Sequence, residues 1–163
     1  MPQLVVLSLG LAAAVVTDVR TRRIPNWLTG AIAAAGFGMA FGGGTVTPLG
    51  AALGLLVGLL LMMPGHVIGA TGAGDVKLMA AVGAMVGPGT VVTAFAFTAI
   101  AGGVLAVAVA IRRRRFAATL AGTGRLIALP TDAKRQIGSA TASSRFAYGP
   151  AIAIGSLLAV LAK

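Results

Sequence analysis

Long apolar runs, separated by short polar or glycine-rich segments, make up most of the chain. Each run lies between charged residues, or between glycine and proline residues that interrupt helices. Because about 20 residues of helix cross the hydrocarbon core of a bilayer, runs of this size predict membrane spans. The runs predicted to be helical are residues 4–17, 28–42, 49–64, 78–111 and 148–162.

Glycine and proline residues divide the two longest uncharged stretches. Gly42 to Pro48 separates the second predicted helix from the third, and we expect the third to end at Pro64-Gly65. The run 78–111 contains Gly87-Pro88-Gly89 near its middle. On length alone this run is either one kinked span or two short ones.

The basic residues decide between these possibilities and orient the chain. Lys77 precedes the divided run and Arg112–Arg115 follow it. Lys and Arg beside spans favour the cytoplasmic side, and only two crossings keep both groups there. The sequence therefore predicts an all-α polytopic membrane protein with six transmembrane helices and both termini extracytoplasmic. Every basic side chain except Lys163 is then cytoplasmic.

Composition supports a membrane protein and narrows its chemistry. Of the 163 residues 58% are hydrophobic and 10% are charged, whereas a soluble domain has roughly 25% charged residues. The net charge of +10 comes from short basic blocks, which we interpret as an orientation signal and not as a nucleic-acid site. The chain has no cysteine, which excludes disulfides and Cys-ligated zinc. We expect no metal and no organic cofactor.

We expect one membrane domain over residues 1–163, with a basic cytoplasmic loop at about 112–147 that attracts anionic lipids. One of the three acidic residues, Asp132, lies in this loop beside Lys134 and Arg135. A solvated ion pair with one of these basic residues is enough to explain an acidic residue at this position.

The other two acidic residues are Asp18, at the end of the first predicted helix, and Asp75, at the start of the fourth. Two crossings separate them, so both reach the cytoplasmic face. Two carboxylates that meet there share a proton, because like charges a few ångströms apart do not ionise together easily. One carboxylate can then activate a water while the other, protonated, polarises a carbonyl.

Three alternatives remain open at this point. Asp18 can pair with Arg22 one helical turn further on, and Asp75 can cap its helix. The two acids can instead form a proton or cation site of a small transporter, although such sites lie nearer the membrane midplane. The protein can also be a non-catalytic assembly factor of a secretion machine.

The residues around the two acids carry a resemblance to a known family. Asp18 is followed by Arg23-Ile24-Pro25-Asn26, and Asp75 lies in Gly72-Ala73-Gly74-Asp75-Val76-Lys77-Leu78. This pair of motifs resembles the type IV prepilin peptidases (peptidase A24), bacterial members of the GxGD intramembrane aspartyl proteases. The resemblance implies that Asp18 and Asp75 are the catalytic pair. The supporting motif residues that it implies are Gly72, Gly74, Lys77, Pro25 and Asn26.

The implied reaction is cleavage after the short basic leader of a prepilin, a precursor whose hydrophobic helix enters between spans of the bacterial inner membrane. The short form looks like the peptidases that serve tight-adherence (Flp-type) pili. Longer relatives carry a Cys-bearing methyltransferase domain, and with no cysteine here we expect no such domain.

Other positions have weaker signals. We expect Pro25 and Asn26 to shape the turn into the second helix, and Lys77 to reach the membrane interface without pairing with the acids. Tyr148-Gly149-Pro150 resembles the start of the last helix in the family; it either lines the cleft or simply begins a helix with Pro in its first turn. We expect His66 to be a loop residue.

Overall fold

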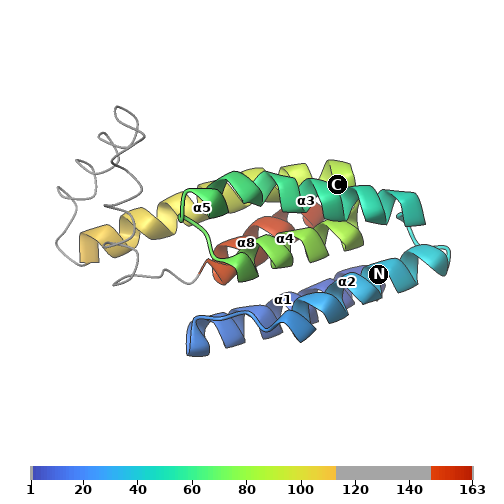
Figure 1. Ribbon diagram of the computed structural model, residues 1–163, viewed down its shortest axis with the longest axis horizontal. Helices are drawn as coiled ribbons and strands as arrows, with labels where there is room; N and C mark the ends of the chain where they lie inside the picture. The colour runs from blue at the N-terminus through green and yellow to red at the C-terminus, as the bar shows by residue number, and fades with distance from the viewer. Residues whose placement is uncertain (1, 113–147, 163) are drawn as a thin grey trace.

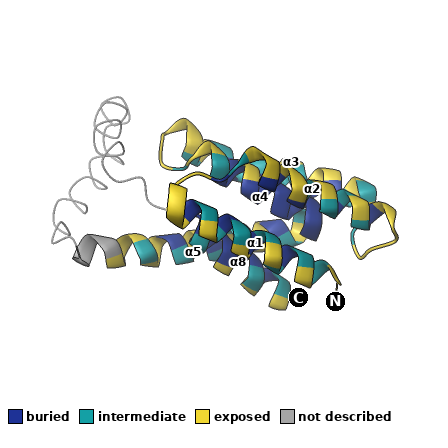
Figure 2. Ribbon diagram, turned by 90° about the horizontal axis from the view of Figure 1, so that it is seen from below, coloured by how far each residue is buried: buried dark blue, intermediate teal, exposed yellow. Residues whose placement is uncertain are grey.

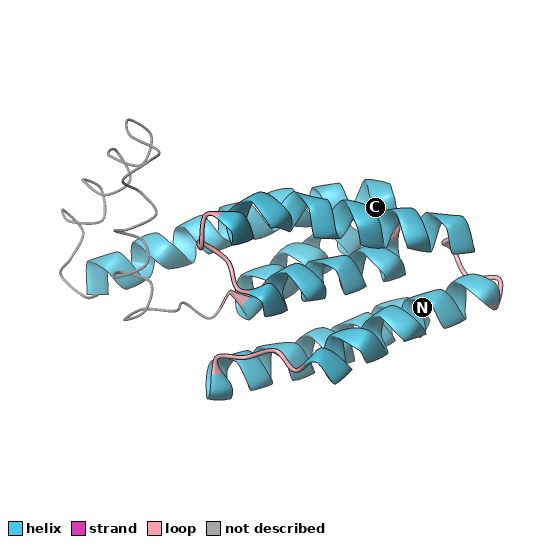
Figure 3. Ribbon diagram, viewed as in Figure 1, coloured by secondary structure: helices cyan, strands magenta, loops and turns pink. Residues whose placement is uncertain are grey.

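The described part of the computed structural model, residues 2–112 and 148–162, consists of helices joined by short loops (Figures 1 and 3). The fold is therefore all-helical over these residues. Its six helices are α1 (Pro2–Thr21), α2 (Asn26–Phe41), α3 (Pro48–Val67), α4 (Ala73–Val86), α5 (Pro88–Arg112) and α8 (Gly149–Leu161).

Successive helices run in alternating directions along one bundle (Figure 1). The two chain ends lie toward the same end of the bundle, on the right in Figure 1. The turn from α1 to α2, the loop before α4 and the start of α8 lie at the opposite end (Figure 3). We name this opposite end, defined by residues 18–26, 72–77 and 148–150, the aspartate end.

Helix α4 is the centre of the bundle, because it contacts all five of the other helices. Every residue from Asp75 to Val86 is buried except Lys77 (Figure 2). Small residues permit this enclosure: Gly54 of α3 lies against Gly83 of α4, and a Cβ at either would collide with the carbonyl oxygen of the other. Such close helix contact through glycine is common in membrane bundles.

Within residues 2–112 and 148–162, three helices are long and apolar enough to cross a membrane, namely α1, α3 and residues 88–108 of α5. Helix α8 is apolar but shorter. Helices α2 and α4 have 16 and 14 residues, fewer than the roughly 20 that a lipid-exposed span needs. The neighbours of α4 enclose it, so its length does not have to match the bilayer.

The predicted breaks are confirmed where glycine and proline act together. Gly87 has φ of 82°, a left-handed conformation that glycine adopts without strain, and it ends α4. Pro88 begins α5, where its missing N–H costs nothing because the first helical N–H groups have no partner within the helix. The run 78–111 is therefore divided between two helices.

Two predicted boundaries are wrong. Helix α1 continues from residue 17 to Thr21, so Asp18 lies within it. Pro64-Gly65 does not end α3, which continues to Val67 with Pro64 inside it, and His66 is in its last turn and not in a loop. Proline removes only its own N–H from the helix, while the Pro64 carbonyl still accepts from the Ile68 N–H at 3.2 Å. Asp132 and most of the predicted basic loop lie outside the described residues.

Candidate active site

Asp18 lies on the buried stripe of α1, in the last turn of the helix. The stripe consists of Leu7, Leu11, Ala14 and Asp18, whose spacing of three and four residues puts them on one helical face. The Asp18 side chain is 5% exposed. Its Oδ2 accepts a hydrogen bond of 2.8 Å from the backbone N–H of Gly149, the first residue of α8. The free N–H groups at a helix start favour an anion in this position.

The Asp18 carboxylate does not have the predicted partner Arg22; it accepts its hydrogen bond from the Gly149 amide instead. Arg22 lies just past the end of α1 with φ of 52°. Its backbone N–H donates to the Asp18 carbonyl at 2.7 Å. Arg22 therefore closes the helix end through its backbone, and its exposed side chain remains at the aspartate end.

Asp75 lies in the first turn of α4 and is 8% exposed. Its Oδ2 accepts a hydrogen bond of 3.0 Å from the backbone N–H of Gly72, the residue before the helix. This is one half of a capping box, so the predicted capping role is observed. Capping and pairing are compatible here, because the Asp18 and Asp75 carboxyl groups also lie within electrostatic range of each other.

The start of α8 lies beside both acids. A Cβ on Gly149 would come 2.7 Å from Asp18 Oδ2, so only glycine fits without displacing that carboxylate. The half-buried Tyr148 phenol lies within electrostatic range of Asp75 and packs against Gly102 of α5. Pro150 follows in the first turn of α8. Tyr148 and Gly149 thus lie near the acids, while the prediction that this segment lines a substrate cleft stays a prediction.

The residues of the predicted supporting motifs also meet at the aspartate end. Pro25 precedes α2, and its carbonyl accepts from the N–H groups of Leu28 and Thr29 at 3.1 and 3.3 Å. Asn26 Oδ1 accepts a hydrogen bond of 2.9 Å from Lys77 Nζ. Lys77 is exposed, as expected, but its ammonium has a specific partner on α2 that its sequence position does not indicate.

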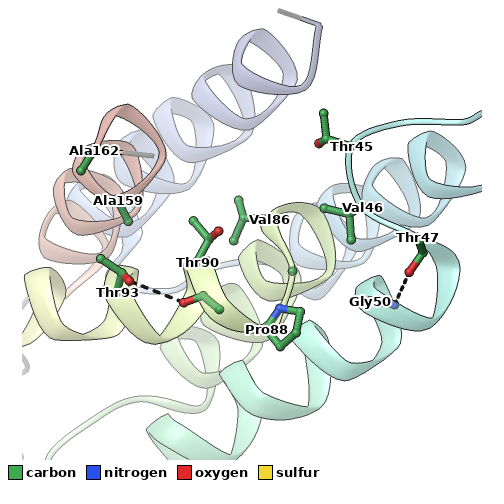
Figure 4. Close-up of a pocket in the computed structure, with 12 residues that line it drawn as sticks. Thr45, Val46, Thr47, Gly50, Val86, Pro88, Thr90, Thr93, Ala159 and Ala162 are labelled. Carbon is green, nitrogen blue, oxygen red and sulfur yellow. Dashed lines mark hydrogen bonds between the residues drawn. The ribbon is translucent and has the colours of Figure 1, made fainter.

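A cleft of about 540 Å³ lies at the other end of the bundle (Figure 4). Among its lining residues are Thr45, Thr90, Val86 and Ala159, which belong to the far ends of α4 and α8 and to the segments beside them. The cleft is therefore separate from the two aspartates. In the part of the chain that the structure describes, no three His, Cys, Asp or Glu side chains form a group that could hold a metal ion.

The Gly149 amide is the site feature that sequence reasoning missed. Its hydrogen bond joins residues 131 positions apart, a pairing that no local pattern predicts. The one available signal was the Gly-Pro pair opening the last apolar run. A glycine before a helix-starting proline is compatible with a close approach by another chain segment.

This arrangement has the components of acid–base hydrolysis. Two buried carboxyl groups whose charges interact do not ionise together easily, so one can serve as the general base while the other stays protonated as the general acid. Each carboxyl group has one oxygen bonded to a backbone N–H, which fixes its orientation. A pair of carboxyl groups, one ionised and one protonated, is the chemical arrangement that aspartic peptidases use.

Comparison with known families identifies the chain more closely. The model of the type IV leader peptidase family matches residues 5–107, a segment that contains both aspartates. The chain belongs to this family, so it is a prepilin peptidase of the type IV pilus class and a protease, of aspartic type in this family. Its apolar helices fit a membrane protein. Comparisons with curated proteins and with solved structures gave no match.

Proposed function

We propose that the protein is an intramembrane aspartyl endopeptidase that removes the short basic leader from Flp-type prepilins at the cytoplasmic face of the bacterial inner membrane. The observation that carries this proposal is the position of Asp18 and Asp75, which are buried, within electrostatic range and oriented by separate backbone amides. Family membership supplies the leader-peptidase activity. The Flp-type substrate rests on the resemblance of the sequence to the short form.

In the proposed reaction, one ionised carboxylate takes a proton from a water, which attacks the carbonyl carbon of the scissile bond. The second, protonated carboxyl group donates a hydrogen bond to the carbonyl oxygen, where negative charge develops. The tetrahedral intermediate then collapses when the leaving amine receives a proton from the pair. No other chemical group is needed for this sequence of steps.

We further propose six membrane spans in a single membrane domain, with both termini extracytoplasmic. The alternating helix directions support this topology. So does the exposed charge, because Arg20, Arg22, Arg23 and Lys77 lie around the aspartate end, where the positive-inside rule favours cytoplasmic residues. We propose that the basic segment 112–147 attracts anionic lipids on the same side.

Co-expression with an Flp-type prepilin tests the proposed function. The wild-type protein is expected to shorten the precursor by its leader, seen as a mobility shift and by mass spectrometry of the new amino terminus. Asp18→Asn and Asp75→Asn are each expected to abolish processing, because each removes one member of the acid–base pair. Asp132→Asn is the matched control and is expected to leave processing intact. Processing that survives either membrane substitution contradicts the dyad.

A further inference from the structure

The segment Ile24-Pro25-Asn26, between α1 and α2, packs on the start of α4. Ile24 is 8% exposed, and a Cβ on Gly74 would lie 3.2 Å from the Ile24 Cβ. Gly74 therefore leaves room for Ile24 one residue before Asp75. This contact joins the chain that follows one aspartate to the chain that precedes the other.

A hydrogen bond between side chains makes a second connection on the exposed side of this contact. Lys77 Nζ donates to Asn26 Oδ1 at 2.9 Å. Lys77 is the exposed residue within the otherwise buried stretch from Asp75 to Val86, and Asn26 is the first residue of α2. A bond to a charged donor is stronger than a neutral one, and this one joins the first residue of α2 to α4 two residues beyond Asp75.

We propose that Asn26 and Lys77 are positioning residues that set the separation of the two aspartates. Their hydrogen bond fixes the start of α2, and with it the end of α1 that carries Asp18, against the turn of α4 that carries Asp75. This inference rests on the proposed function. Its catalytic consequence follows from geometry, because reacting groups displaced by about 1 Å can lose on the order of a hundredfold in rate.

A competing role for Lys77 is that of a membrane-interface cation, which holds the topology without a specific partner. The two roles differ in what they predict for Asn26. An interface cation does not depend on Asn26, whereas a positioning pair loses its function when either partner is removed. The competing role also predicts that other exposed cations nearby, such as Arg20, are equally important.

Steady-state cleavage of a prepilin by the full-length protein in detergent or liposomes separates these roles. Lys77→Met and Asn26→Ala are each expected to lower kcat about tenfold while KM changes less than about twofold. The kcat of the double variant is expected to be no lower than that of the less active single variant, because both substitutions remove the same hydrogen bond. Asn26→Asp retains the acceptor oxygen and is expected to keep near wild-type kcat. Arg20→Ala also removes one positive charge at the aspartate end, so it is the control for Lys77→Met, and it is expected to change kcat little.

A second measurement does not depend on activity. The chain has no cysteine, so cysteines placed at positions 18 and 75 form a unique pair for a short bifunctional thiol reagent. Lys77→Met in this background is expected to slow cross-linking several-fold, because a looser contact widens the distribution of separations. The same substitution should leave unchanged the rate at which a monofunctional reagent labels each single cysteine.

The outcomes distinguish this inference from the proposed function. Failure of the wild-type protein to cleave any prepilin overturns the proposed function, while the cross-linking measurement still tests the pair. Normal kcat in both Lys77→Met and Asn26→Ala, with unchanged cross-linking, overturns the positioning role alone. Losses that multiply in the double variant also overturn it, because they show two independent effects.

Discussion

Replacing Gly149 with alanine adds one methyl group where α8 meets Asp18. That Cβ would lie 2.7 Å from Asp18 Oδ2 and 3.1 Å from the Asp18 Cβ. A carbon and an oxygen in ordinary contact are about 3.4 Å apart, so the carboxylate or the helix start must move by about 0.7 Å. The backbone N–H remains at position 149, but its hydrogen bond to Asp18 is lengthened or bent.

The displacement predicts the size of the kinetic effect. Because a shift of about 1 Å can cost on the order of a hundredfold, we expect kcat to fall on the order of 50-fold, which corresponds to about 2.3 kcal/mol in activation free energy. KM is expected to change little, because the substituted residue holds a reacting carboxylate in place. The new contact with buried Asp18 is also expected to lower the unfolding temperature, and the better helix propensity of alanine offsets only part of that loss.

The assay is steady-state leader cleavage, with thermal unfolding in detergent measured on the same preparation. Gly103→Ala is the matched control, because a Cβ at Gly103 in α5 meets no other atom within 4 Å. The control variant is expected to match the wild-type kcat. If Gly149→Ala keeps kcat within about threefold of wild type while folding normally, the Gly149 amide does not position a catalytic Asp18.

Two further predictions address packing and protonation. Gly83→Ala is expected to lower the free energy of unfolding by about 3 kcal/mol, because its Cβ collides with the backbone of Gly54. Gly38→Ala is the control, because a Cβ at Gly38 meets open space. Equal unfolding temperatures for the two variants would refute the close α3–α4 contact. The pH profile of kcat/KM is expected to be bell-shaped, because the fully protonated pair has no general base and the fully ionised pair has no general acid. A profile that rises with pH to a plateau would show that no protonated carboxyl group is required.

The helices were predictable from the sequence where local chemistry decides a boundary. Gly87 and Pro88 act through their own backbone angles and missing donor, so the break between α4 and α5 could be predicted without the fold. Pro64 was misleading because one proline removes one helical hydrogen bond, and the next turn of α3 can still form. The position of His66 followed from that error.

The candidate site was predictable only in outline. Two intervening helices bring Asp18 and Asp75 to one end of the bundle, and the number of predicted helices between the two acids was enough to anticipate this. The capping contact of Asp75 was predictable from its place at a helix start. The partner of Asp18 was not, because its donor is a backbone amide and every residue except proline carries one. Only the fold selects Gly149 as the donor to Asp18.

The contacts give a physical reason for the spacing within the two motifs. Gly72 supplies the N–H that orients Asp75, Gly74 leaves room for Ile24, and Lys77 reaches Asn26. The motif around Asp75 is therefore complementary to the segment that follows Asp18, and neither motif is explained alone. The segment that matches the family ends at residue 107, yet the donor to Asp18 lies beyond it in α8. The match therefore contains both acids but not α8, whose Gly149 amide binds Asp18. A chain truncated before α8 should lose leader cleavage even though both aspartates remain.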